Sequence, residues 1–253
     1  MKKRAADILY TVLGAALIVA AWYISAAASG DRILFPTPAD TLRALGACFR
    51  AKWFWRAFFG SFLRALLAFA VSLGLAGLLA FLGKVCPPVR RVLAPIVGTV
   101  RSVPTMSVIL ILVLLLGGAY TPVVVAGLVV FPVLYSGLWA AVAAIPKELD
   151  ETALLNAPSR PYRFFKVTLP MLMPSFSLCV SGALGLTLKL TVAAEVLSQT
   201  RQSVGLLMQQ SRLSFDMGRL MALTIAVIVS SLLLEGVVWL VRKLCGWGEN
   251  DIA

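Results

Sequence analysis

The longest stretch without a charged residue covers residues 102–146. One helix of that length would measure roughly 68 Å at 1.5 Å per residue, about twice the thickness of the hydrocarbon core of a bilayer. The chain must therefore turn within this stretch, and Gly117 and Gly118 followed by Pro122 are typical of a turn. We interpret the stretch as two successive membrane-spanning helices.

The composition extends this interpretation to the whole chain. Hydrophobic residues make up 60% of the 253 positions and charged residues 13%, whereas soluble domains average roughly 45–50% and about 25%. The sequence therefore predicts an all-α membrane protein with about six transmembrane helices in a single domain over 1–253. The expected spans are 8–28, 61–83, 92–117, 122–145, 174–198 and 220–243.

The basic N-terminus followed by an apolar run has the outline of a signal peptide. The uncharged run over 8–30 exceeds the 7–15 residues of a signal-peptide core, and it is long enough to cross a bilayer. We therefore expect a membrane helix here.

The net charge of +12 indicates cytoplasmic loops and contact with anionic lipid, because nucleic-acid binding needs a basic face free of membrane segments. With both termini cytoplasmic, slightly more Lys and Arg lie inside than outside. We expect a multi-pass protein of a bacterial-type plasma (inner) membrane in this orientation. The basic residues expected outside are concentrated in 41–56, which we interpret as an amphipathic helix with Trp53 and Trp55 on the membrane surface.

The residue types argue against chemistry carried by this chain. Histidine is absent, and the four cysteines are far apart, so neither a His-based metal site nor a Ser-His-Asp triad is predicted. The phosphate-binding pattern G-x-x-x-x-G-K-[ST] does not occur. We therefore expect no catalytic residue, metal or cofactor on this chain. Any ATP and Mg would have to be bound by another chain, and an ion gradient is the other possible source of energy.

The most informative polar segment is the loop over 146–173. Its acidic residues suit the first turn of a short helix, which Pro158 ends. Ser159 can cap a second, basic and aromatic helix that ends at Leu169 and Pro170. Such an element can dock into a soluble partner, or it can be an ordinary connector on the membrane surface.

This loop resembles the EAA loop of binding-protein-dependent ABC transporter permeases. That loop reads Glu-Ala-Ala, three residues, Gly, nine residues, Ile, one residue and Leu-Pro. The residues at these spacings are Glu151, Thr152, Ala153, Ala157, Val167, Leu169 and Pro170. Thr152 replaces the second Ala of the pattern, and Ala157 replaces the Gly.

Three further stretches resemble the nitrate, sulfonate and taurine branch of these permeases. They begin at Leu34 (Leu-Phe-Pro-Thr-Pro), Arg101 (Arg-Ser-Val-Pro) and Val192 (Val-Ala-Ala-Glu-Val-Leu). The resemblance implies a type I importer permease fold with a cytoplasmic coupling-helix loop.

The resemblance also implies partners: a cytoplasmic ABC ATPase dimer, a second permease copy or paralogue, and an extracytoplasmic substrate-binding protein. The residues expected to couple to the ATPase are Glu151, Thr152, Ala153, Ala157, Pro158, Ser159, Arg163, Val167, Leu169 and Pro170.

Four charged residues inside or near the expected spans are candidates for the translocation path: Arg101, Lys189, Glu195 and Glu235. A charge at mid-membrane is costly and needs a reason. Arg101 and Glu235 lie at similar depths from the inner face, so they can form an ion pair. Lys189 has no acid at its depth and is expected to face a central cavity and attract an anionic substrate. The alternatives for Lys189 are snorkelling and an interhelical hydrogen bond.

The function that these features predict is the permease subunit of an ABC importer. Its expected cargo is a small anionic solute such as a sulfonate or nitrate, moved by alternating access. The alternative is a secondary transporter driven by an ion gradient, in which Lys189, Glu195 and Glu235 would form a relay. A membrane-embedded enzyme is disfavoured by the lack of histidine and the few carboxylates within the spans.

Overall fold

The protein is described by a computed structural model, which covers residues 2–30, 34–143, 162 and 169–244. Within these ranges the chain forms helices and no strand, so the all-α prediction is confirmed. The helices are α1 (Lys2–Ser29), α2 (Pro38–Arg50), α3 (Lys52–Val85), α4 (Pro87–Ser102), α5 (Thr105–Leu116), α6 (Thr121–Ala143), α9 (Leu169–Ser198), α10 (Val204–Leu213) and α11 (Met217–Leu244).

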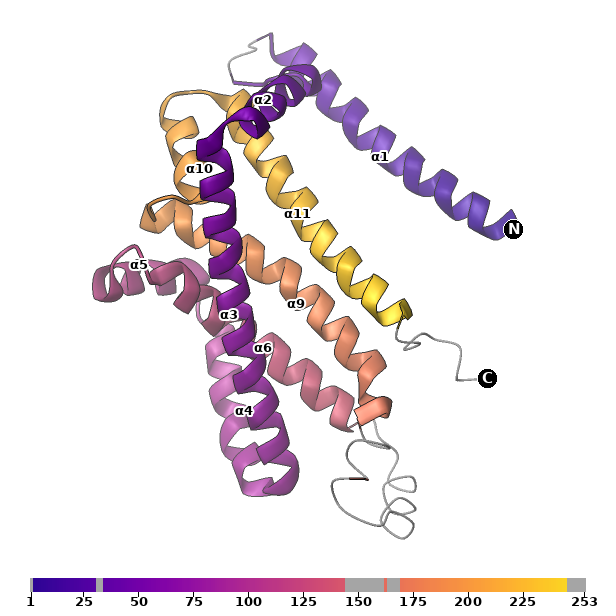
Figure 1. Cartoon of the computed structure of the whole chain (residues 1–253), viewed down its shortest axis with the longest axis vertical. Helices are drawn as coiled ribbons and strands as arrows, with labels where there is room; N and C mark the ends of the chain where they lie inside the picture. The colour runs from indigo at the N-terminus through magenta and orange to yellow at the C-terminus, as the bar shows by residue number, and fades with distance from the viewer. Residues whose placement is uncertain (1, 31–33, 144–161, 163–168, 245–253) are drawn as a thin grey trace.

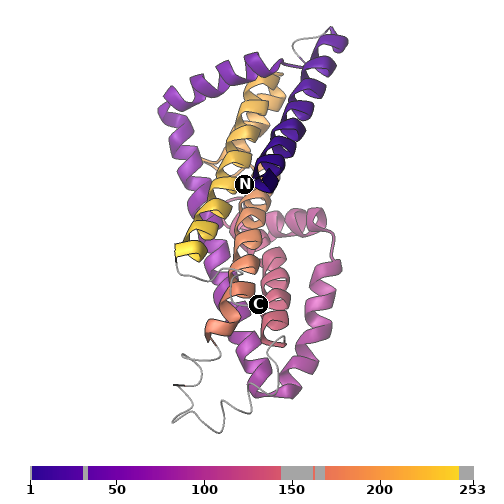
Figure 2. The same cartoon turned by 90° about the vertical axis from the view of Figure 1, so that its right-hand side faces the viewer.

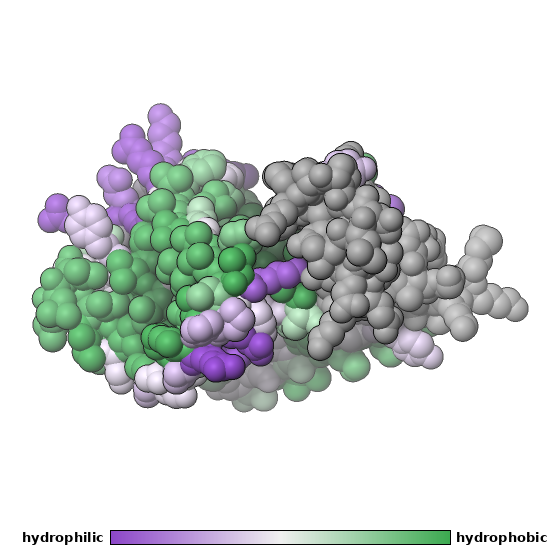
Figure 3. Space-filling model, turned by 90° about the horizontal axis from the view of Figure 1, so that it is seen from below, coloured by the Kyte–Doolittle hydropathy of each residue, from purple (hydrophilic) through white to green (hydrophobic). Residues whose placement is uncertain are grey.

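Five of these helices are long and apolar enough to cross a membrane: α1, α3, α6, α9 and α11. The pair α4 and α5 forms a sixth candidate span, broken in its middle. In Figure 1 successive spans run in alternate directions. The start of α1 and the end of α11 are therefore the lower ends of these two helices in that view. Figure 3 views the molecule from this end and shows apolar residues over much of the surface that is not drawn in grey.

The expected span over 92–117 is broken into two helices, α4 and α5. The chain turns by 93° between α4 and α5, and Figure 2 shows the resulting corner. Val103 is extended, with φ −72° and ψ 129°, because the ring of Pro104 disfavours the helical conformation of the preceding residue. The Arg-Ser-Val-Pro stretch beginning at Arg101 forms this corner.

The amphipathic helix expected over 41–56 is shorter than predicted. Thr37 caps α2 by accepting a hydrogen bond from the Asp40 backbone N–H, and the helix ends at Arg50. After Ala51 the chain enters α3, so Trp53 and Trp55 belong to the first turns of the long span rather than to the surface helix. The Trp55 indole donates to the Phe49 carbonyl at 2.9 Å across the break, and both tryptophans remain exposed.

The core of the bundle lies around α9. This helix packs most extensively against α6 and also contacts α3, α10 and α11. Small residues allow the close approach of α3 and α6: Ser72 is buried and donates to the Gly127 carbonyl at 2.9 Å. By contrast, α1 packs on α2 and diverges from the bundle along the rest of its length (Figure 1), and only 6% of its apolar window is buried.

The contact between α6 and α9 predicts a specific sensitivity at Gly137. A Cβ at this position would collide with the Cys179 sulfur on α9. Gly137→Ala should therefore lower the free energy of unfolding by about 1–3 kcal/mol through overpacking, measured as a lower thermal midpoint in detergent. Gly74→Ala on α3 is the control, since a Cβ there meets nothing within 4 Å.

Removing the sulfur should relieve the strain. The double variant Gly137→Ala/Cys179→Ala is expected to regain part of the lost stability. Equal stability of Gly137→Ala and Gly74→Ala would contradict this packing.

Candidate functional site

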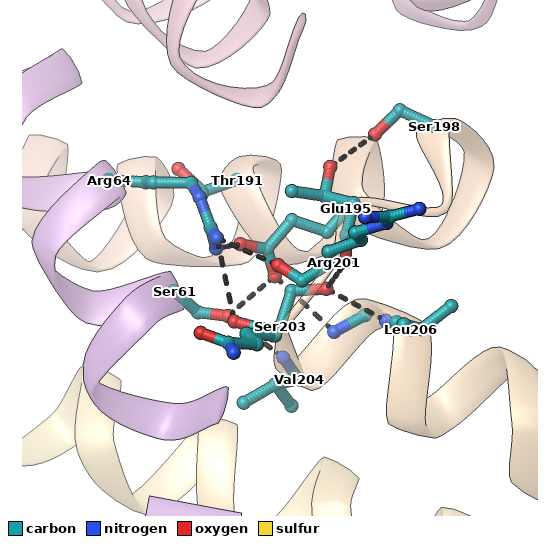
Figure 4. A network of polar contacts seen from close by, with 12 residues as sticks. Ser61, Arg64, Thr191, Glu195, Ser198, Arg201, Ser203, Val204 and Leu206 are labelled. Atoms are coloured by element: carbon teal, nitrogen blue, oxygen red, sulfur yellow. Dashed lines mark hydrogen bonds and ion pairs between the residues drawn. The ribbon is translucent and has the colours of Figure 1, made fainter. Parts of the chain in front are cut away.

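A buried carboxylate organises the end of the bundle at which α9 ends and α10 begins. Glu195, near the end of α9, is fully buried. Figure 4 shows its side chain pointing towards Ser61 and Arg64, both from α3. Ser61 donates to Oε2 at 2.6 Å, and Arg64 Nη1 donates to Oε1 at 2.7 Å as an ion pair.

The third donor to this carboxylate comes from the start of α10. The Gly205 N–H donates to Glu195 Oε2 at 3.3 Å. Only glycine fits here, because a Cβ would collide with the Glu195 Cβ and lie 2.6 Å from the Val196 nitrogen. The neighbouring Val204 N–H donates to Ser61 Oγ at 2.9 Å. The first turn of α10 is thus held against both α9 and α3.

Arg64 has a second role beyond the ion pair. Its Nη2 donates to the carbonyls of Arg201 at 3.0 Å and Gln202 at 3.4 Å. These residues belong to the connection between α9 and α10, in which Gln202 adopts a positive φ of 50°. The guanidinium therefore holds the backbone of this connection in place and also pairs with Glu195.

The same network reaches the turn between α5 and α6. Thr200 Oγ1 donates to the Gly118 carbonyl at 2.6 Å and lies 2.8 Å from Ser198 Oγ. Ser203 caps α10 by accepting from the Leu206 N–H at 3.0 Å. In the orientation that the sequence predicts, this end faces outward, so we call the set Ser61, Arg64, Glu195, Thr200, Ser203 and Gly205 the outer network.

The outer network holds the ends of α3, α9 and α10 together through hydrogen bonds and one ion pair. Each carboxylate oxygen of Glu195 has at least one donor, and a buried charge is tolerated only when it is satisfied in this way. Within the described residues, no group of His, Cys, Asp and Glu is arranged to hold a metal ion.

Sequence reasoning proposed Glu195 and missed its partner. The partner is Arg64 of α3, which lies within the expected span over 61–83. The sequence feature that could have indicated this pair is the similar depth of the two residues in the membrane. Arg64 borders the apolar run over 65–83, at the end of α3 that meets the end of α9. Periodicity along one segment does not pair residues that are 131 positions apart.

Lys189 lies on the face of α9 that the other described helices leave uncovered. Its side chain is exposed, as are Leu178, Gly182 and Ala193 at helical spacing along the same face. Within the described ranges Lys189 forms no ion pair, which agrees with the absence of an acid at its depth.

The structure does not form the expected ion pair between Arg101 and Glu235. Glu235 on α11 lies against Gly185 of α9, whose missing side chain leaves room for the carboxylate. Arg101 on α4 lines a cavity beside α6. The corner at Pro104 carries α4 along α3 and α6, whereas α11 packs on α9 and α2, so equal depth does not bring the two charges together.

Most of the expected ATPase-coupling residues lie outside the described residues: Glu151, Thr152, Ala153, Ala157, Pro158, Ser159, Arg163 and Val167. Leu169 and Pro170, expected to end a loop helix, instead begin α9 ahead of the predicted start at 174. Proline is accepted in the first turn of a helix, where its missing N–H has no partner to lose.

The chain matches the family of binding-protein-dependent transport system inner membrane components over residues 73–244. This match covers more than half of the chain. The chain belongs to this family, the permease type of ABC importers. Members of this family are the permease components of transport systems.

Two solved structures share the fold. An inward-facing structure of the MetNI methionine ABC transporter matches with a TM-score of 0.63 and 14% identity, over 75% of this chain and 93% of that chain. A bacterial ABC transporter involved in the import of the acidic polysaccharide alginate matches with a TM-score of 0.60 and 17% identity, over 95% and 96%. These likenesses support a type I permease-like fold. No curated protein matches the permease significantly.

The outer network predicts a strong coupling between Arg64 and Glu195. Arg64→Met leaves the buried carboxylate without its charge partner, so it should lower the free energy of unfolding by about 3–5 kcal/mol. Arg64→Met/Glu195→Gln should lose less than Arg64→Met alone, because no unpaired charge remains. Thermal unfolding in detergent measures both.

Arg56→Met is the matched control, since Arg56 is an exposed arginine on the same helix. Additive losses in the double variant would show that the two charges do not interact.

Proposed function

We propose that this chain is the permease subunit that forms the translocation path of an ABC importer. The family match over 73–244 carries the proposal, because it encloses the loop over 146–173 with the EAA-type spacing. In this proposal a separate cytoplasmic ATPase dimer binds ATP and Mg and hydrolyses the ATP, while this chain performs no covalent chemistry.

The loop over 146–173 is proposed as the docking surface for the ATPase. It connects the two helices with the most extensive mutual packing, α6 and α9. Because packed helices move as units, a displacement of the loop would be transmitted along both. Closure of the ATPase dimer would then reorient the spans around the path in an alternating-access cycle.

A second permease copy or paralogue is proposed to complete the path. Two surfaces support this: α1, which is largely unburied, and the exposed face of α9. Gly182 and Ala193 on that face permit close helix approach, and Lys189 lies between them. An extracytoplasmic binding protein would deliver the substrate to the side that carries the outer network.

We place the protein in a bacterial-type inner membrane with both termini in the cytoplasm. The loop would then share a side with the termini, and the exposed Cys86 between α3 and α4 would lie on that side too. Labelling of Cys86 by an impermeant maleimide from one side of the membrane tests this orientation.

The substrate class is proposed to be a small anion such as a sulfonate or nitrate, as in the branch that the sequence resembles. Lys189 supports this proposal because a cation on the open face of the central helix attracts anions and repels cations. Arg101 and Glu235, which do not pair, are proposed to border the path at its inner half. Glu195 is proposed to hold the outer end of the path through the outer network.

If the ATPase docks on this loop, changes in the loop should abolish its binding. The tagged wild-type chain should co-purify with its cognate ATPase, whereas Glu151→Lys and deletion of 156–161 should lose it, because charge and shape at the docking surface change. Arg43→Glu at the other end of the bundle is the charge-reversal control, since that side chain is 81% exposed. A wild-type chain that runs alone, with uptake driven by an ion gradient, would establish the alternative of a secondary transporter, which the family match does not favour.

Lys189 predicts a change in transport without a loss of assembly. In proteoliposomes containing the complete importer, Lys189→Ala should lower ATP-driven uptake of methanesulfonate about tenfold, the effect of roughly 1.4 kcal/mol from one lost charge interaction. Lys189→Arg should retain uptake, and Lys52→Ala, an exposed lysine at the start of α3, is the control. Unchanged methanesulfonate affinity and uptake in Lys189→Ala would remove Lys189 from the path.

A further inference from the structure

A cavity of about 290 Å³ lies between α4 and α6, away from the outer network and from Lys189. One wall is α4, which contributes Arg90, Ala94, Val97, Gly98 and Arg101. The other wall is α6, which contributes Tyr135, Ser136 and Trp139. Of these residues only Arg101 has a place in the proposed transport cycle, at the border of the path; the arrangement of Arg90, Tyr135 and Trp139 around it is not used there.

The two arginines present positive charge to one space. Arg90 and Arg101 are about three turns apart, which places them within about 20° of each other on one face of α4 and about 16 Å apart along its axis. An arginine side chain spans several ångströms, so the two guanidinium groups can approach a common ligand from opposite ends of the cavity. Neither arginine forms an ion pair with a carboxylate among the described residues.

Arg90 is held in place by an aromatic ring rather than by an acid. Its guanidinium lies 4.3 Å from the centroid of the Trp139 ring. A cation–π contact orients an arginine without neutralising its charge. The N–H groups at the edge of this guanidinium therefore remain able to donate to an anion.

Tyr135 supplies a neutral donor. The residue is 5% exposed, and its hydroxyl is buried without a hydrogen-bond partner. A buried hydroxyl that lacks a partner costs free energy, and a ligand that accepts a hydrogen bond would recover it. The neighbouring Ser136 hydroxyl is already used, since it donates to the Pro132 carbonyl at 2.7 Å.

We infer that this cavity binds the oxyanion group of an amphiphilic or small organic anion, a phosphate, sulfonate or carboxylate. Arg90, Arg101 and the Tyr135 hydroxyl donate to it, and Val97 and the Trp139 ring accommodate its apolar part. An unpaired guanidinium is costly in a membrane, and a bound anion removes that cost. The oxyanion can belong to the headgroup of an anionic phospholipid or to a soluble anion entering from the cytoplasm.

The inference does not rest on the importer role, because it concerns binding to the isolated full chain. Two probes distinguish the sources. Native mass spectrometry of the detergent-purified chain counts retained phosphatidylglycerol, with phosphatidylcholine as the neutral lipid. Thermal unfolding in phosphatidylcholine nanodiscs, with added methanesulfonate or inorganic phosphate, reports binding of a soluble anion as a raised midpoint.

The variants are Arg90→Gln, Arg101→Gln and Tyr135→Phe. The matched control is Arg91→Gln, because Arg91 is an exposed arginine on the same helix that does not line the cavity. Arg90→Gln and Arg101→Gln should each weaken binding about tenfold for whichever probe the wild-type chain binds, as expected for one lost charge-assisted hydrogen bond. Arg101→Lys should retain part of the affinity, which separates loss of charge from loss of fold.

Retention of phosphatidylglycerol that depends on Arg90 and Arg101 would assign the site to lipid. Stabilisation by methanesulfonate or phosphate with the same dependence would assign it to a soluble anion. The inference is overturned if the wild-type chain binds neither probe, or if Arg91→Gln weakens binding as much as Arg90→Gln does.

Discussion

The hydrocarbon core of a bilayer offers no hydrogen-bond partner to a peptide group or a side chain, and this constraint shapes the backbone, the polar side chains and the charges of this structure. The backbone answers it by helix formation across all the candidate spans. Several polar side chains within the spans meet this constraint by donating hydrogen bonds to backbone carbonyls. The hydroxyls of Ser72, Thr187, Thr191 and Ser230 each donate to the carbonyl four residues earlier in the same helix. Ser72 also donates to the Gly127 carbonyl across the contact between α3 and α6, so one hydroxyl serves both its own helix and the packing.

The charged residues within or near the spans are accommodated in three different ways. Glu195 is fully buried, and it is satisfied by Ser61, Arg64 and the Gly205 N–H. Glu235 is half-buried in the space left by Gly185. Arg90 and Arg101 have no acid and face a cavity instead. The paired charge connects α3, α9 and α10, whereas the unpaired arginines are the ones for which we propose a ligand.

The central helix α9 links the two ends of the molecule. It begins at Leu169, directly after the segment proposed to meet the ATPase, and carries Glu195 close to its end. Its 30 residues extend about 45 Å if straight. Lys189 lies between these ends on the open face. In the proposed cycle, a helix held by the outer network at one end would convert movement of the proposed docking loop into a change at the other end of the path.

Sequence and tertiary structure determined different parts of this protein. The uncharged runs were sufficient to predict an all-helical membrane protein and the approximate positions of its spans, because burial in a bilayer depends on hydrophobicity summed along a segment. The spacing from Glu151 to Pro170 was sufficient to suggest the family, because that pattern is local.

The positions of proline show where local reasoning stops. Pro95, Pro132 and Pro174 lie inside helices that continue through them, whereas Pro104 follows an extended Val103 and separates two helices at 93°. The residue type is the same, so packing against neighbouring helices decides whether the chain turns. That corner then directs α4 along α6 and prevents Arg101 from meeting Glu235. The pairing of Glu195 with Arg64 was likewise decided only in three dimensions, because electrostatic partners are selected by distance through space and not by depth or period along one helix.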